Sequence, residues 1–251
     1  MEQITSRKNP LITHIRKLIT DRAYRRECGE FVGDGVKLLA EAARWNAPLS
    51  CVVHTAGTAL PTLPEGVRVV QVPEDVMASI SPMKAPQGAL FLCGMPGQDV
   101  PEKLSGQRYM VLDGLQDPGN VGTIWRTVDA LGADGLILTG ECADPWNHKT
   151  VRATMGACFR LPVYEVKRQD LPALLERSDL PLYATALRED TLDLREADLR
   201  RCAVAIGSEG RGVSEEVLAM SRKTLKIPMR ERCESLNAAA AATVVLWEMA
   251  R

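Results

Sequence analysis

The stretch Tyr109-Met-Val-Leu-Asp-Gly-Leu-Gln-Asp-Pro-Gly-Asn-Val-Gly-Thr-Ile-Trp-Arg126 joins a short apolar run to a segment of helical character. The run 109–113 is typical of a buried parallel strand, and the pattern over 121–131 predicts a helix. The Pro and Gly residues between them predict a turn. This turn would lie at the carboxyl end of a strand, where open α/β sheets bind their ligands.

Two later stretches also follow short apolar runs: Ile206-Gly-Ser-Glu-Gly-Arg-Gly212 and Ile227-Pro-Met-Arg-Glu-Arg-Cys-Glu-Ser-Leu-Asn237. The apolar and amphipathic patterns around them predict strands at 135–139, 163–166, 182–185, 202–206 and 224–227, and helices at 149–157 and 171–177. Strands separated by helices predict a parallel sheet with helices on both faces. The three loops are therefore expected at one edge of that sheet.

The closing segment, Ser235 to Arg251, contains five consecutive alanines, which favour a smooth helix. Ser235 is a natural N-cap for this helix. Bulkier residues from Val244 to Met249 indicate that its second half is also buried, with a second subunit as a candidate partner. The plainer alternative is an amphipathic C-terminal helix.

The first part of the chain reads as a smaller α/β domain, with an amphipathic helix at 10–20 and a strand, glycine turn and helix from Phe31 to Trp45. The segment 94–106 is rich in Pro and Gly and predicts a linker. We therefore divide the chain into a domain at 1–97 and a second at 106–251.

Composition narrows the class of protein. The 251 residues are 45% hydrophobic and 25% charged, which is ordinary for a soluble globular protein. No apolar run is long enough to cross a bilayer, and the polar start has no signal-peptide core, so a cytoplasmic location is expected. Seven scattered cysteines and three separated histidines match no metal-binding spacing, so no metal site is predicted.

The net charge is only −1, but cations are concentrated locally in residues 1–30 and 221–232. Phosphate binding requires local cations and not a basic total. The alternative is that both segments are solvated faces without a ligand.

The three loops carry an amide, a guanidinium, a carboxylate and a hydroxyl: Asn120, Arg126, Glu209, Ser235 and Asn237. Such a set can orient a hydroxyl and a phosphate, but without His, Cys or metal it does not suit redox or metal-dependent hydrolysis. Each loop alone also has a plain structural interpretation as a capped helix start or a glycine turn. Their combination favours a shared site.

Together the three loops resemble, in order and spacing, the three motifs of the SpoU/TrmH family of RNA 2′-O-ribose methyltransferases, within the SPOUT superfamily. The resemblance covers about 108–251. Residues 1–93 are similar to the substrate-binding domain that many members carry, which resembles RNA-binding ribosomal proteins, although Asp34-Gly35 stands where the family often has Glu-Gly. The resemblance implies a C-terminal trefoil knot and a homodimer.

The resemblance further implies transfer of a methyl group from S-adenosylmethionine to a ribose 2′-hydroxyl of structured RNA, ribosomal RNA first and transfer RNA second. Arg126 would orient the phosphate and stabilise the developing alkoxide, because guanidinium does not lose its proton. Asn120 and Glu209 would hold Arg126 or the substrate, and Ser235 and Asn237 would position the ribose. The residues that match the family's cofactor-binding positions are Thr185, Ala186, Gly207, Ile227 and Leu236.

Target RNA would be held by phosphate contacts from six basic residues: Arg7, Lys8, Arg25, Arg26, Lys149 and Arg152. The chain departs from the family pattern at His148-Lys149, where members commonly have Pro-Lys.

Two rival classes of protein remain. A Rossmann-type oxidoreductase would use Gly119, Gly122 and an acid such as Glu141, but the third glycine and a hydride-handling residue are missing. A non-catalytic RNA-binding assembly factor is disfavoured by the complete polar set.

Overall fold

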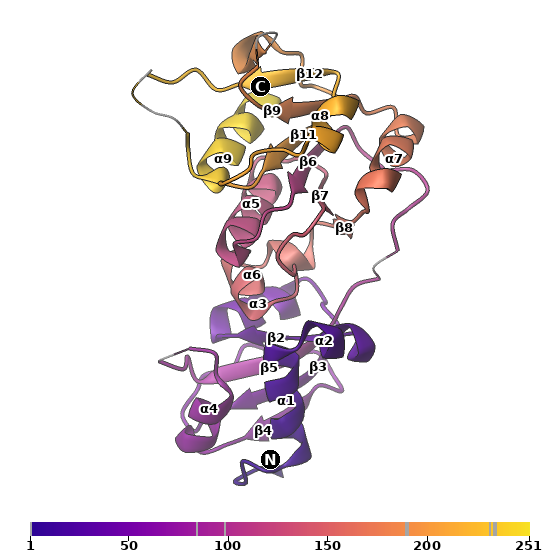
Figure 1. Ribbon diagram of the computed structural model, residues 1–251. Helices are drawn as coiled ribbons and strands as arrows, with labels where there is room; N and C mark the ends of the chain where they lie inside the picture. Colours follow the sequence, from indigo (N-terminus) through magenta and orange to yellow (C-terminus); the bar gives the residue numbers. More distant parts are fainter. Residues whose placement is uncertain (1, 84, 98, 189–190, 231, 233–234) are drawn as a thin grey trace. The chain divides into compact units, whose positions relative to one another are not determined.

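The computed structural model describes residues 2–83, 85–97, 99–188, 191–230, 232 and 235–251 (Figure 1). The chain forms two compact units. Unit 1 comprises residues 1–97 and 144–160, and unit 2 comprises 98–143 and 161–251.

Unit 2 is built on a sheet of seven strands in the order β10-β12-β9-β11-β6-β7-β8, and every neighbouring pair is parallel. The strands are β6 (Arg108–Asp113), β7 (Gly135–Thr139), β8 (Val163–Glu165), β9 (Leu182–Thr185), β10 (Leu192–Asp193), β11 (Cys202–Gly207) and β12 (Lys223–Lys226). The central strands β6, β7 and β11 are almost wholly buried, which is why their sequences are continuous apolar runs. This confirms the predicted parallel-sheet fold.

Helices cover both faces of this sheet (Figure 1). They are α5 (Pro118–Ala130), α7 (Leu171–Arg177), α8 (Glu215–Met220) and α9 (Ala238–Met249). Side chains of α7 and α8 share one core with alternate residues of β6, β9 and β11, and α9 packs on α5, β6 and β11. The threading of α9 through a knot stays a prediction.

The caps of two helices place the loops. Asp117 caps α5 by accepting a hydrogen bond from the Asn120 N–H at 2.7 Å, and Pro118 stands at the first helical position. Asn237 caps α9 by accepting from the Ala239 N–H at 2.9 Å. The prediction that Ser235 caps this helix is therefore wrong, since the helix begins two residues later than Ser235 would allow.

Unit 1 contains a mixed sheet of five strands in the order β1-β4-β3-β5-β2. Strand β5 runs antiparallel to β2 and β3, and β4 runs parallel to β3 and β1. The strands are β1 (Glu2–Gln3), β2 (Glu30–Asp34), β3 (Leu49–His54), β4 (Arg68–Gln71) and β5 (Ala89–Gly94), and the helices are α1 (Pro10–Thr20), α2 (Arg22–Cys28), α3 (Val36–Arg44) and α4 (Glu74–Ile80). Apolar residues of α1 and α4 form a core with one face of the sheet.

Residues 144–160, which include α6 (His148–Ala153), pack with unit 1 although they lie far along the chain. Arg25 and Asp144 form a buried ion pair with an N–O distance of 2.6 Å. The ring centroids of Phe31 and Trp146 lie 4.9 Å apart. The sequence-based division at 97 and 106 assigns this segment to the second domain. The structure corrects that assignment, because a buried charge pair and an aromatic contact tie the segment to unit 1.

Within the described residues, no helix combines the length and the apolar character needed to cross a membrane.

Candidate active site

The three loops meet at the carboxyl edge of the unit 2 sheet. The Asn120 side-chain amide donates a hydrogen bond to the Glu209 carboxylate, and the Asn237 amide donates to the Asn120 carbonyl oxygen at 3.3 Å. Asn120 stands in the first turn of α5, Glu209 in the loop after β11, and Asn237 at the start of α9. One residue from each loop is thus joined in a single hydrogen-bonded chain.

The loop after β11 has a fixed shape. Ser208 and Gly212 exchange two backbone hydrogen bonds, of 3.2 Å and 2.8 Å, so the loop closes on itself and carries Glu209 at its tip. Gly207 is packed so tightly that a Cβ atom there would lie 1.9 Å from the backbone carbon of Gly212. No residue with a side chain can replace Gly207 without moving this loop.

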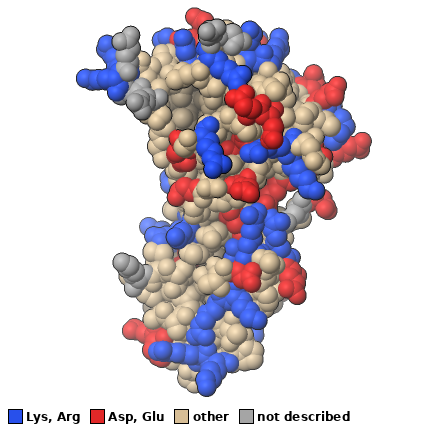
Figure 2. Space-filling model, in the orientation of Figure 1, with Lys and Arg blue, Asp and Glu red and all other residues tan. Residues whose placement is uncertain are grey.

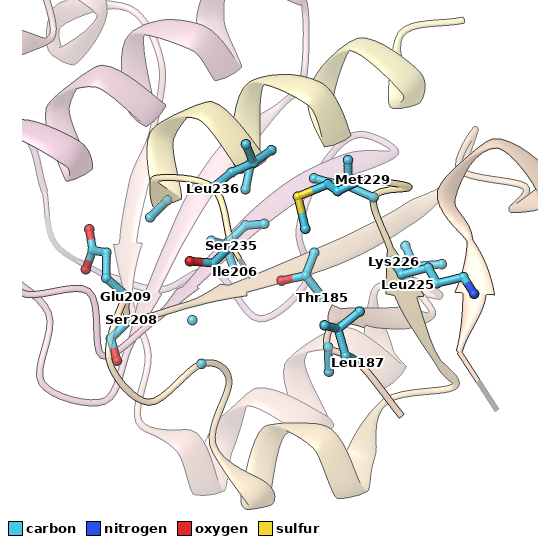
Figure 3. A pocket seen from close by; sticks show the side chains of 16 residues that line it. Thr185, Leu187, Ile206, Ser208, Glu209, Leu225, Lys226, Met229, Ser235 and Leu236 are labelled. Atoms are coloured by element: carbon cyan, nitrogen blue, oxygen red, sulfur yellow. The ribbon is translucent and has the colours of Figure 1, made fainter. Parts of the chain in front are cut away.

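Beside the hydrogen-bonded chain lies a cavity of about 260 Å³, which we call the first cavity (Figure 3). All five residues predicted to bind the cofactor are in its lining: Thr185, Ala186, Gly207, Ile227 and Leu236. Apolar side chains that sequence reasoning missed, Leu187 and Met229, complete the wall. Ser235 also lines the first cavity, and Glu209 stands at its margin (Figure 3).

The first cavity suits a small organic ligand. Its volume is close to the lower end of the range for such sites, about 300–1,000 Å³. Its walls are mostly backbone and apolar side chains, supplied by the loops at the ends of β9, β11 and β12 and by the start of α9. S-adenosylmethionine fits such walls, because its adenine ring needs an apolar slot and its polar atoms can bond to backbone groups.

Arg126 does not join the chain of Asn120, Glu209 and Asn237. It is exposed on α5, and it makes no hydrogen bond or ion pair with any residue that the structure describes. Six residues along an α-helix correspond to a rotation of about 240°, so Arg126 points about 120° away from Asn120. Within one chain these two side chains therefore face different directions.

A second polar cluster, which sequence reasoning did not identify, lies next to the site. Asp113, at the end of β6, has a side chain only 1% exposed. Its carboxylate accepts a hydrogen bond from the Arg168 guanidinium at 2.9 Å and from the Ser214 backbone N–H at 2.7 Å. The position of Asp113 at the last residue of a buried strand was the only signal in the sequence.

Thiol chemistry is disfavoured here. Burial raises the pKa of Cys142, which lies near Asp113, to about 11, and that of Cys202 on β11 to about 12. Both thiols are therefore protonated at neutral pH and poor nucleophiles. Among the described residues, no group of His, Cys, Asp and Glu side chains could hold a metal ion.

The residues predicted to contact RNA have different environments. Arg25 is 3% exposed and bound to Asp144, so its assignment as a phosphate contact is wrong. Arg7 is exposed but paired with Asp75 at 2.9 Å. Lys8 and Arg26 are exposed on the same unit, and Figure 2 shows that basic side chains gather on one face of it. Lys149 and Arg152 are exposed on α6.

A parallel sheet with a cavity and polar side chains at its carboxyl edge is the ligand-binding arrangement of an open α/β fold. Residues 107–247 match the SpoU rRNA Methylase family, and residues 9–90 match the MRM3-like substrate binding domain. The chain belongs to the SpoU rRNA methylase family.

Relatives match over nearly the whole chain. The 23S rRNA (guanosine(2553)-2′-O)-methyltransferase RlmP of Bacillus subtilis is 31% identical, with 99% of both chains covered. The 23S rRNA (uridine(2479)-2′-O)-methyltransferase of Streptomyces viridochromogenes is 30% identical, with 99% of this chain and 92% of that protein covered. The AdoMet-bound rRNA methyltransferase of Sinorhizobium meliloti is a solved structure with a TM-score of 0.86 and 31% identity, covering 99% of this chain and 97% of that one.

These matches confirm the predicted family, the fold with its N-terminal substrate-binding domain, and the predicted class of enzyme, a methyltransferase that uses S-adenosylmethionine. They also agree with the predicted methylation of ribose in ribosomal RNA.

Proposed function

We propose that this protein methylates a ribose 2′-hydroxyl in the RNA of the large ribosomal subunit. We also propose that the reaction takes place in the cytoplasm. The observation that supports this most directly is the hydrogen-bonded chain of Asn120, Glu209 and Asn237 at the margin of the first cavity. It places polar groups that can hold a sugar hydroxyl beside a site that suits the methyl donor. Full-length relatives that act on 23S rRNA support the choice of RNA.

S-adenosylmethionine supplies an electrophilic methyl group on a sulfonium, so the protein has to position the attacking oxygen and manage its proton. The lining residues Thr185, Gly207 and Leu236 would hold the donor. Asn120 and Glu209 would bind the ribose, and Ser235 would contact the sugar from the cavity wall. Arg126 would bind the neighbouring phosphate and stabilise the negative charge that develops on the 2′-oxygen.

The active form in this proposal is a homodimer. Val244 and Trp247 on α9 are 40% and 63% exposed, and apart from Thr243 and Glu248 every residue of this helix is apolar. A helix that is apolar all round is normally covered. Arg126 lies on α5, which packs against α9, so a second copy seated on α9 would also approach Arg126. Sedimentation should show a dimer for the wild type and a monomer for Trp247→Glu.

Unit 1 would provide affinity for the RNA. Lys8, Arg26, Lys149 and Arg152 would contact phosphates, and Arg7 would do so after release from Asp75. Such contacts make binding depend on salt. Alanine at Lys8 and Lys149 together should weaken RNA binding and reduce the salt slope by about two.

The deciding experiment supplies labelled S-adenosylmethionine and the RNA of a strain that lacks the gene. Label in a 2′-O-methyl nucleoside of large-subunit ribosomal RNA supports the proposal. Label in transfer RNA would replace the proposed substrate, and no label in any RNA would contradict the activity.

A further inference from the structure

A second cavity, of about 590 Å³, opens next to the first. The two cavities share Ser208, Glu209 and Gly212, so both lie against the loop that follows β11. We infer that the second cavity receives the nucleobase of the nucleotide that is methylated, and that this base is guanine. The inference rests on the proposed function, and it names the substrate for the same site.

The position of the second cavity follows from the reaction. The 2′-oxygen has to meet the methyl donor at the margin of the first cavity, where Glu209 stands. The ribose is then held between the two cavities, because the loop that carries Glu209 lines both. The donor occupies the first cavity, so the base attached to that ribose enters the second. Enzymes that do chemistry on a base take it out of the stack, and the same movement would bring the base of the methylated nucleotide into the second cavity.

A hydrogen-bonded ion pair forms part of the wall of the second cavity. Asp113 and Arg168 both line it, and their side chains are joined by N–O distances of 2.8–2.9 Å. Asp113 also accepts the backbone N–H of Ser214, which begins the helix after the loop. The Asp113 carboxylate is thus already hydrogen-bonded to Arg168 and Ser214. Its bond to Ser214 anchors the end of the loop that lines both cavities.

Three other residues that line the second cavity are exposed: Gln116, Glu141 and Arg211. The side chains of these three residues make no hydrogen bond to any other described residue, so they are free to bind a ligand. A carboxylate such as that of Glu141 only accepts hydrogen bonds, and it has two oxygens side by side. Guanine is the base whose Watson–Crick edge offers two adjacent donors, N1–H and the N2 amino group. The Arg211 guanidinium is suited to the O6 and N7 acceptors of the same base.

The other bases fit this set less well. Adenine and cytosine each present one amino group beside a ring-nitrogen acceptor, and uracil presents one N–H between two carbonyl oxygens. Each would place an acceptor against the Glu141 carboxylate, which cannot donate a hydrogen bond. Repulsion between acceptors in a partly enclosed site would therefore select against them.

Nucleoside analysis tests the base directly. RNA from the strain that lacks the gene is methylated with labelled donor, digested and separated by mass. We expect label in 2′-O-methylguanosine. Label in the 2′-O-methyl form of adenosine, cytidine or uridine overturns the inference while the proposed function stands. An absence of label in every nucleoside contradicts the proposed function itself, and with it the inference.

A variant and a modified substrate test the contact. Glu141→Gln should lower kcat/KM by about tenfold or more on the same RNA without changing S-adenosylhomocysteine binding, and the exposed control Glu176→Gln should change neither. An RNA fragment with inosine at the target position lacks the N2 amino group. The kcat/KM of the wild type should therefore be about tenfold lower on this fragment than on the guanosine fragment, and the kcat/KM of Glu141→Gln should fall much less. Equal losses for both enzymes would show that Glu141 does not contact the base.

Discussion

Asn120 and Glu209 are 89 positions apart in the chain, yet the amide of one donates a hydrogen bond to the carboxylate of the other. Asn237 donates to the same Asn120 side chain. A carboxamide is suited to this central role, because it can donate and accept at the same time. Asn120 therefore organises all three loops, and its loss should affect the glutamate and the second asparagine together.

We expect Asn120→Ala to reduce the rate of methyl transfer by about 100-fold, which is typical for the loss of one well-placed polar group in an active site. Binding of S-adenosylhomocysteine should stay near the wild-type value, because Asn120 does not line the first cavity. Single-turnover kinetics and calorimetry measure the two quantities. Thr123→Ala, an exposed change on the same helix, is the matched control. A large loss of cofactor affinity in Asn120→Ala would contradict this division of roles.

Arg126→Ala should abolish methyl transfer and leave cofactor binding nearly intact. Because Arg126 faces away from Asn120 on α5, we expect it to act in the site of a second copy. A mixture of Arg126→Ala and Asn120→Ala subunits would then form heterodimers with one complete site each. After random exchange, about a quarter of the wild-type activity should return. If the mixture is as inactive as its components, the two residues serve the same site within one chain.

Gly207→Ala should abolish S-adenosylhomocysteine binding, because the added Cβ would collide with the backbone of Gly212 and open the loop beside the first cavity. Gly210→Ala is a matched control for cofactor binding, since a Cβ there meets no atom within 4 Å. Calorimetric titration of both variants checks this. Wild-type affinity in Gly207→Ala would mean that the loop can shift without harm to the cavity.

Arg25→Ala should destabilise the protein by about 3–5 kcal/mol, because it leaves the buried Asp144 carboxylate without its partner. Lys8→Ala, on the surface of the same unit, should change the free energy of unfolding by less than about 0.5 kcal/mol. Urea denaturation measures both. A stable Arg25→Ala variant with weakened RNA binding would restore the original assignment of Arg25 as a phosphate contact.

His148 should make unit 1 less stable in acid. Burial, and then the nearby Lys149 and Arg25, lower the pKa of its imidazole. Below the unfolded pKa, about 6.5, the unfolded chain binds a proton that the folded state excludes, so stability falls as the pH falls. The urea midpoint should drop between about pH 7.5 and pH 5.5 in the wild type, and less in His148→Gln. Identical slopes in the two proteins would exclude this role.

The strands that carry the site were predicted correctly from the sequence, and the reason is physical. Strands such as β6 and β7 are buried on both faces, so their residues are continuously apolar, and the loops after them carry Pro and Gly. The five cofactor positions came from the family resemblance, and the structure gathers them around one cavity.

Other features depend on contacts that no local pattern records. The pairing of Arg25 with Asp144 joins residues 119 positions apart, so the basic pattern of the N-terminal segment could not show that one of its cations is buried. Helix α2 was missed because only Asp21 separates it from α1, without Gly or Pro. The spacing of Asn120 and Arg126 likewise gave no direction for either side chain until the helix boundaries were known.

The return of residues 144–160 to unit 1 has a consequence for synthesis. When residue 97 leaves the ribosome, Arg25 still lacks the carboxylate that neutralises it, and Phe31 lacks the ring of Trp146. The core of unit 1 cannot form completely until residues 144–160 have been translated. Unit 1 of the nascent chain therefore stays incompletely folded while about sixty more amino acids are added.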